Sequence, residues 1–264
     1  MKENIEPAPS VLDNCEKLSS KPLAYKTGHF IVEAEKEYIL KAVGWAKFIE
    51  SNVYPIMVEM MGHKPTVDVH ALHVVDRKLR GSEGPGAWFE GIKRFPNTQY
   101  VCSDIKIFHG KLSNIPPYRP EGDITHETIH GLLDETKNGR NRTTKWKPIW
   151  QSELLDRIFE IELSQRLGNK TKSEERYRKC LKKEGNYAVL AEFWNAYTWE
   201  PFKSLILCLH DDPDFPPGLF DHSGFTYYMS LFAKEDVSSF FEKQGWIIDN
   251  ETKERIKKEL QIRG

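Results

Sequence analysis

The hydrophobic pattern of the first half of the chain changes period several times. Residues 29–35 and 66–75 are rich in closely spaced apolar side chains and are typical of strands, and residues 87–89 and 99–102 are shorter strand candidates. Between them, residues 37–61 carry apolar side chains at helical spacing, and Pro55 is expected to break or kink that helix. The first half is therefore predicted to be mixed β structure with one long helix.

The second half has a different character. After Pro120, apolar positions recur at helical spacing over residues 123–136, 149–167, 172–183, 187–209, 237–244 and 251–262. Residues 1–27 are rich in Pro, Ser, Lys and Glu and are expected to form a loosely attached leader. We predict an α+β fold in which residues 28–264 form one domain, with a β-containing lobe to about residue 122 and a helical lobe after it.

Composition and charge narrow the classes of partner. The 264 residues carry 38 basic and 39 acidic side chains, a formal net charge of −1, which does not favour a nucleic-acid partner. No apolar run is long enough to cross a bilayer, and the first residues lack the apolar core of a signal peptide, so the compartment stays open between the cytoplasm and export after signal removal. The four cysteines have no metal or redox spacing and are read as free thiols. The oligomeric state is not predicted.

The most informative segment is residues 122–135, GDITHETIHGLLDE. His126 and His130 stand four residues apart, so on a helix their imidazoles lie on one face and can reach one tetrahedral ion. Glu127 points toward the same side and can take a proton from a metal-activated water. An accidental occurrence of this spacing is the alternative, but the flanking apolar residues suit a buried helix.

A zinc ion needs at least a third protein ligand. Leu133 and Thr136 stand where metzincins have Gly and a third ligand, which excludes that pattern. Residues 146–160, WKPIWQSELLDRIFE, resemble the segment that carries the third ligand in aminopeptidase N-like gluzincins. The resemblance implies that Glu153 is the third metal ligand, the alternative being an exposed helix carboxylate. Asp156 could orient a ligating histidine through a hydrogen bond, or form a surface ion pair.

Two further segments resemble the same enzymes. Residues 86–91, GAWFEG, are similar to the edge strand that binds extended substrate, which implies substrate contacts at Ala87 and Trp88. Glu90 is displaced by one position from the family glutamate that holds a free amine, and the aromatic residues could instead belong to the core. Downstream, residues 221–232 lie where relatives carry an oxyanion-stabilising side chain, which implies His222, Tyr227 or Tyr228. Residues 240–246 are similar to the closing helices of enhancin-like metallopeptidases and suit packing.

The remaining histidines lack ligand spacing. His70 and His73 are three apart, on a predicted strand that places them on opposite faces, and both are interpreted as structural or surface residues.

Together these features predict a zinc-dependent hydrolase with a thermolysin-like two-lobed fold. One zinc ion is expected, held by His126, His130 and Glu153, with Glu127 as general base and a peptide or protein as substrate. The alternative is a noncatalytic module that keeps the gluzincin site to bind peptides or glycopeptides.

Overall fold

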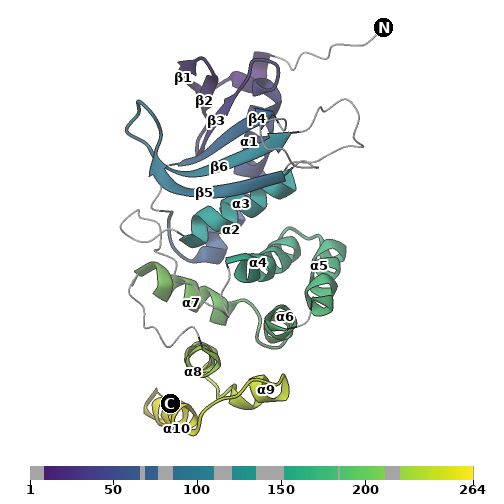
Figure 1. The fold of residues 1–264 in the computed structure, drawn as a ribbon, viewed down its shortest axis with the longest axis vertical. Helices are drawn as coiled ribbons and strands as arrows, with labels where there is room; N and C mark the ends of the chain where they lie inside the picture. Colours follow the sequence, from purple (N-terminus) through teal and green to yellow (C-terminus); the bar gives the residue numbers. More distant parts are fainter. Residues whose placement is uncertain are drawn as a thin grey trace. The chain divides into compact units, whose positions relative to one another are not determined.

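The computed structural model describes residues 9–65, 69–76, 86–109, 121–134, 152–183, 185–211 and 221–263. The chain has an α+β fold, as predicted, and divides into two compact units (Figure 1). The first, here called the sheet unit, comprises Met1–Met57 and Pro65–Asn141. The second, the helical unit, comprises Val58–Lys64 and Arg142–Gly264. The division falls after residue 141 rather than near the expected residue 122, because the helix that follows residue 120 packs on the sheet.

Six strands form the mixed sheet, in the order β1-β2-β3-β4-β6-β5. The β4 strand pairs in parallel with both β3 and β6, whereas the other neighbouring strands are antiparallel. The last strand in this order, β5, pairs with β6 and lies at an edge. The bounds are β1 Glu16–Ser20, β2 Leu23–Lys26, β3 Phe30–Ala34, β4 Val69–Asp76, β5 Gly86–Arg94 and β6 Val101–His109.

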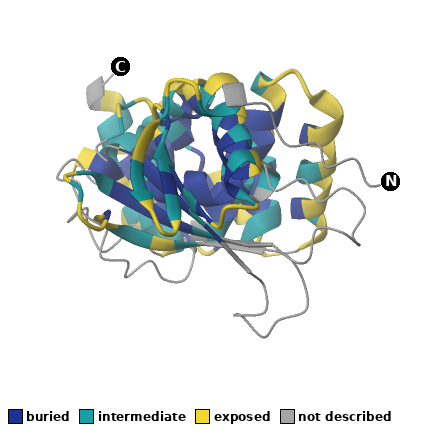
Figure 2. Cartoon of the chain, turned by 90° about the horizontal axis from the view of Figure 1, so that it is seen from above, coloured by how far each residue is buried: buried dark blue, intermediate teal, exposed yellow. Residues whose placement is uncertain are grey.

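Two long helices cover one face of this sheet. The α1 helix (Ile39–Asn52) packs against β3, and α3 (Glu121–Asp134) packs against β5 and β6. The two helices also touch each other, so they share a face. A short 3-10 helix, Pro9–Leu12, adjoins α1. The α2 helix (Tyr54–Met61) follows directly after α1 in the chain. The expected break near Pro55 is confirmed, since α1 ends at Asn52 and α2 begins at Tyr54. Buried positions run along the central strands and the inner sides of the helices (Figure 2).

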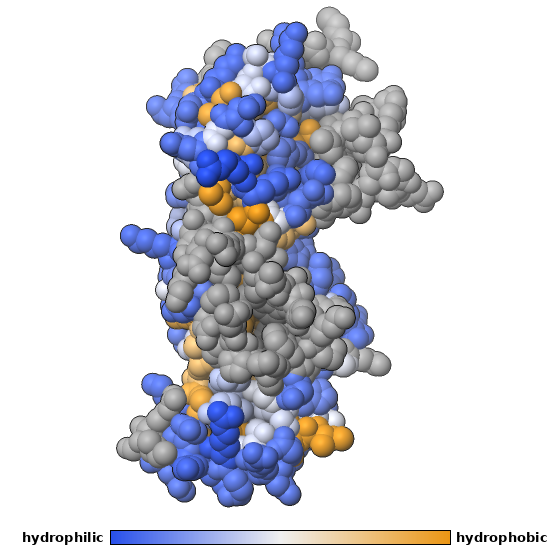
Figure 3. All heavy atoms as spheres, turned by 60° about the vertical axis from the view of Figure 1, so that its left-hand side comes forward, coloured by the Kyte–Doolittle hydropathy of each residue, from blue (hydrophilic) through white to orange (hydrophobic). Residues whose placement is uncertain are grey.

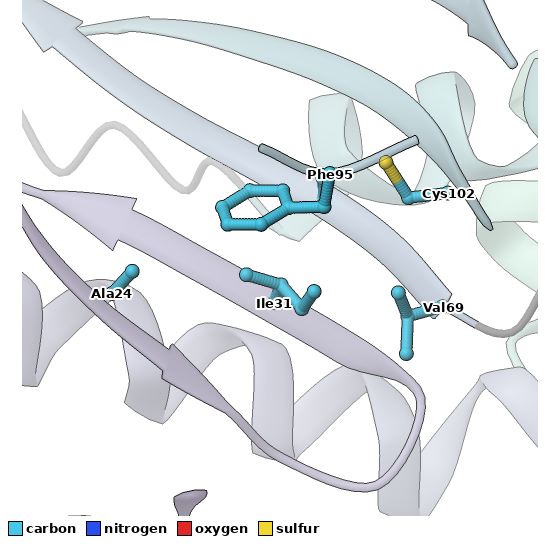
Figure 4. Close-up of a cluster of buried hydrophobic side chains, with 6 residues drawn as sticks. Ala24, Ile31, Val69, Phe95 and Cys102 are labelled. Atoms are coloured by element: carbon cyan, nitrogen blue, oxygen red, sulfur yellow. The ribbon is translucent and has the colours of Figure 1, made fainter. Parts of the chain in front are cut away.

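The face of the sheet opposite α1 and α3 carries a cluster of buried apolar side chains (Figure 4). Side chains alternate between the two faces along each strand. Every second residue therefore points toward the helices, and the residues between them point to the opposite face. Leu18 and Tyr100 pack against this cluster. Its buried members are Ala24, Ile31, Val69, Ala71, Phe95 and Cys102.

The N-terminal region differs from expectation. Residues 1–27 are expected to be a loose leader, but residues 16–26 form β1 and β2, which pair with each other and extend the sheet beyond β3. The β1 sequence EKLSS is largely exposed, so it has no strong apolar alternation by which the strand could be recognised. This segment is a strand because it pairs with β2, a contact that its own apolar pattern does not indicate.

The described part of the helical unit contains seven helices besides the end of α2. Their core is aromatic: Phe193 stacks on Phe241 at 5.1 Å between ring centroids, and Trp199 stacks on Phe202 at 5.6 Å. The Trp199 indole N–H donates to the Met60 carbonyl at 2.9 Å, which ties residues 58–64 to this unit. The helices are α4 Ser152–Arg166, α5 Lys170–Lys182, α6 Asn186–Tyr197, α7 Glu200–Asp211, α8 His222–Ala233, α9 Ser238–Lys243 and α10 Asn250–Arg263.

Most of these helices agree with the pattern, but α8 has no counterpart among the ranges expected from apolar spacing, and one expected helix is divided. A single helix over residues 187–209 is expected, but the structure has two, α6 and α7. Thr198 between them has a φ of 64°, a left-handed backbone that ends α6. Pro201 lies in the first turn of α7, where its missing N–H is tolerated, and it is the sequence signal for this break.

The described helices include none that is both long and apolar enough to span a membrane. On the face drawn in Figure 3, hydrophilic side chains predominate among the described residues, and hydrophobic ones form small separate groups. The described surface on this side therefore has no broad apolar area.

A row of alternating charges crosses four adjacent strands. Glu33 on β3 pairs with His73 on β4 at 3.0 Å, His73 pairs with Asp104 on β6, and Asp104 pairs with Lys93 on β5. Burial lowers the pKa of His73, but its bonds with Asp104 and Glu33 outweigh this and raise the pKa to about 9. Burial raises the pKa of Asp104, but His73 and Lys93 reverse that shift and hold it below its usual value. The row links the edge strand β5 to the middle of the sheet.

The protonation of His73 predicts a pH dependence of stability. Its pKa rises from 6.5 to about 9 on folding, so its stabilising effect is complete below about pH 6.5 and is lost as the pH rises through about 9. We expect His73→Gln to remove this part of the pH dependence. Chemical denaturation of both proteins between about pH 6 and pH 10 measures it. Parallel curves of unfolding free energy against pH would contradict the assignment.

Candidate metal centre

The α3 helix carries the two predicted histidine ligands in a buried position. Ile124, Ile129 and Leu132 are at most 1% exposed, which confirms the apolar face expected from the sequence. His126 and His130 are 9% and 8% exposed, and both belong to the sheet unit. Polar side chains buried to this degree need partners, so their arrangement has to satisfy their ring nitrogens.

The two imidazoles converge through the same type of atom. Nε2 of His126 and Nε2 of His130 are 3.2 Å apart, and the rings are inclined at 82° with centroids 4.7 Å apart. Two nitrogens that each lie about 2.0–2.1 Å from a tetrahedral zinc ion are separated by about 3.3–3.4 Å. The observed separation fits that geometry, so the pair can share one ion.

The α4 helix, in the helical unit, carries two candidate carboxylates for a third ligand, Glu153 and Asp156. Asp156 lies in the second turn of α4 and is 0% exposed. Two imidazoles and one carboxylate are ligands that zinc accepts.

Glu153, the expected third ligand, is placed differently. It lies in the first turn of α4, and its side chain is 47% exposed. One carboxylate oxygen is 3.4 Å from Nη2 of Arg157, a separation at the long end of a hydrogen-bonded ion pair. Of these two carboxylates on α4, Asp156 is buried and Glu153 is half-exposed, and which of them binds a metal stays a prediction.

Glu127, the predicted general base, is 6% exposed and follows His126 directly on α3. On an α-helix, successive side chains are rotated by about 100°. Glu127 therefore points between the direction of the histidine pair and that of Gly131, one turn later, which faces the sheet. This direction is next to that of the histidine pair, and the role of Glu127 as general base stays a prediction.

Two of the three expected oxyanion candidates, His222 and Tyr227, take part in helix packing. His222 begins α8, and its ring stacks on Trp246 with centroids 4.4 Å apart, while burial lowers its pKa. Tyr227 is 6% exposed, and the Arg255 guanidinium lies 4.0 Å from the centre of its ring. These contacts give both side chains a structural role, and the oxyanion role stays a prediction.

The expected substrate strand does lie at an edge. Ala87 and Trp88 belong to β5, where they pair with Ile107 and Lys106 of β6, and β5 also packs against α3. The side chains of Ala87 and Trp88 lie outside the described part of the chain. A register shift between Phe89 and Gly91 places Glu90 at a bulge, where it pairs with Lys106 at 2.9 Å. A displacement by one position moves a side chain to the other face of a strand only where the alternation of faces is regular. The bulge interrupts that alternation at Glu90.

Gly131 was not singled out from the sequence, although it sets the contact between α3 and the sheet. A Cβ atom added there would lie 2.7 Å from Oγ and 2.8 Å from Cβ of Ser103 on β6. Any larger residue would need α3 or β6 to move. A glycine inside a helical pattern was the available signal, because glycine weakens a helix and often marks a position where close packing requires it.

Comparisons with known proteins give a fold and no function. No protein-family model matches the chain, and no curated protein sequence does. Two solved structures, both described as a functionally unknown conserved protein from Bacillus anthracis str. Ames and one of them a mutant, match with TM-scores of 0.55 and 0.54 at 15% identity. They cover 90% and 89% of this chain, which spans about half of theirs, 51%. At this identity the likeness concerns the fold alone.

The close approach at Gly131 gives a prediction about the metal helix. Gly131→Ala should destabilise the protein by about 1–3 kcal/mol and weaken zinc binding, because the added methyl group displaces α3. Ser103→Gly in the same chain should recover part of both losses, since it removes the two atoms that the methyl group meets. Chemical denaturation and zinc titration measure the two effects.

Gly122→Ala is the matched control. Gly122 also lies in α3, but an added Cβ there would meet nothing within 4 Å. This change should leave zinc binding unaltered and favour the helix slightly. Equal losses from the two alanine variants, or no recovery with Ser103→Gly, would show that the contact does not position α3.

Proposed function

We propose that this protein is a zinc-dependent hydrolase that cleaves peptide bonds. The observation that carries the proposal is the convergence of His126 Nε2 and His130 Nε2, 3.2 Å apart, on the buried helix α3. Because the histidines are on the same face of one helix, their convergence needs no adjustment of the backbone. Their burial excludes competing water, which strengthens electrostatic interactions with a cation.

The proposed ligands are His126, His130 and Asp156. Asp156 is favoured over Glu153 because it is 0% exposed within the helical unit, whereas Glu153 is half-exposed and faces Arg157. Three protein ligands leave the fourth position of a tetrahedral ion open, which is typical of catalytic rather than structural zinc sites. A zinc ion held there would polarise a substrate carbonyl and lower the pKa of a coordinated water to about 7.

Glu127 is the proposed general base. Its carboxylate would accept the proton that the attacking water loses and later deliver it to the amine nitrogen of the departing peptide. Its position next to His126 on the buried helix keeps this proton transfer away from bulk solvent. His222 and Tyr227 stay candidates for the side chain that donates to the developing oxyanion.

A peptide is the proposed substrate class because of β5. This strand is at the edge of the sheet and packs beside the helix that carries Glu127. An extended peptide can add to such an edge through main-chain hydrogen bonds, which suits substrates of varied sequence. Ala87 and Trp88 lie in the part of β5 that would make these bonds.

A noncatalytic peptide-binding module is the second candidate, since β5 and the metal ligands would also serve binding alone. Glu127 favours catalysis, because binding does not require a buried carboxylate beside the metal position.

Glu127→Gln separates the two candidates. The variant should keep its zinc, because Glu127 is not a ligand, and should lose activity by about 10²–10⁴-fold, because the amide cannot take up the proton. Zinc content is measured by elemental analysis, and cleavage is followed by mass spectrometry on a mixed peptide library. Undiminished cleavage would exclude Glu127 as the base, and peptide binding without cleavage by the zinc-loaded wild type would favour the binding module.

A paired substitution tests the third ligand. Asp156→Asn keeps the size of the side chain but removes the charge, so zinc affinity should fall by at least about 10–100-fold. Glu153→Gln is the matched control on the same helix and should bind zinc as the wild type does. Competition with a chelator measures both affinities. The reverse result, with zinc lost in the Glu153 variant only, would assign the ligand to Glu153.

A further inference from the structure

A chain of buried polar side chains lies behind α3, within the sheet unit. His70 on β4 contacts Ser103 Oγ on β6 through Nδ1, and its Nε2 is 3.1 Å from the Tyr54 hydroxyl on α2. His70 and Ser103 are 0% exposed, and Tyr54 is 4% exposed. Phe30 packs beside His70, with ring centroids 5.4 Å apart. None of these three polar residues can meet a substrate.

His70 is neutral in this environment. Burial lowers the pKa of His70 to about 3, and the nearby His29 adds to the shift. A neutral imidazole has one donor nitrogen and one acceptor nitrogen, and the hydroxyl groups of Ser103 and Tyr54 can each donate or accept. Either tautomer therefore satisfies both ring nitrogens, and the two contacts fix the ring and the Ser103 side chain in one orientation.

The fixed end of this chain supports the metal helix. Ser103 Oγ and Cβ would lie within 2.8 Å of a Cβ added at Gly131, and Nδ1 of His70 would lie at 3.5 Å. Gly131 follows His130 directly and is one helical turn after Glu127. The position of the Ser103 side chain therefore limits how deeply α3 can sit on the sheet at the turn that carries these residues.

We propose that Tyr54, His70 and Ser103 are positioning residues that hold α3 at one depth on the sheet and so direct the imidazoles of His126 and His130 at a shared metal ion. This proposal rests on the zinc site proposed above. A buried polar group that is fully satisfied adds little net stability over an apolar group of similar shape, but its directional bonds restrict side-chain geometry. The effect on metal geometry should therefore exceed the effect on stability.

The test compares two substitutions of His70 with one on the far face of the sheet. His70→Leu removes both polar contacts, whereas His70→Asn keeps an amide that can reach Ser103. Ile31→Val is the control, because Ile31 is buried in the cluster of Figure 4, away from α3. Zinc affinity, the visible absorption spectrum of the Co²⁺-loaded protein and the free energy of unfolding are measured for each variant.

We expect His70→Leu to bind zinc about tenfold or more weakly and to change the Co²⁺ spectrum, which reports ligand geometry. His70→Asn should recover most of both properties, and Ile31→Val should lose stability with unaltered metal binding. If His70→Leu does not fold, Tyr54→Phe, which removes one hydroxyl group, should show the same changes on a smaller scale.

Wild-type affinity and spectrum in the His70 variants, or in Tyr54→Phe where His70→Leu does not fold, would overturn the positioning role while leaving the zinc site intact. Losses of affinity that follow stability equally in Ile31→Val would also overturn it, because the effect would then be general. A wild-type protein that binds neither Zn²⁺ nor Co²⁺ would instead refute the proposed function itself.

Discussion

The approach of two imidazole nitrogens to 3.2 Å on a buried helix is the interaction on which the proposed chemistry depends. Both are Nε2 atoms, and four-residue spacing brings both rings to one side of α3. One cation can accept both lone pairs at this separation, and a carboxylate as third ligand would balance part of its charge. Glu127 and the edge strand β5 matter to catalysis only if that cation binds.

The sheet unit constrains where this helix can lie. At Gly131 the backbone of α3 meets Ser103 without an intervening side chain, and Ser103 is held by His70. On the other face, the charged row from Glu33 to Lys93 ties the edge strand to the central strands. The two faces thus contribute differently: one sets the depth of the helix, and the other joins the strand beside it to the rest of the sheet.

The sequence predicted the features that depend on neighbouring residues better than those that depend on long-range contacts. The helical period over residues 123–136 and the spacing of His126 and His130 placed the buried pair on α3, because both depend on neighbouring residues alone. Glu153 and Asp156 are only three residues apart on α4, so spacing could not decide which would join the histidines. The resemblance favoured Glu153, whereas burial favours Asp156. The contact between His70 and Ser103 depends on the pairing of β4 with β6, which the sequence pattern does not specify. The β1 strand was missed because its sequence is polar and exposed.

The most direct test of the metal centre is a crystal structure of the zinc-loaded protein with anomalous diffraction measured at the zinc absorption edge. We expect one strong peak, about 2.0–2.2 Å from Nε2 of His126, Nε2 of His130 and a carboxylate oxygen of Asp156. A peak bound by other residues, or the lack of any peak at this position in zinc-saturated crystals, would contradict it.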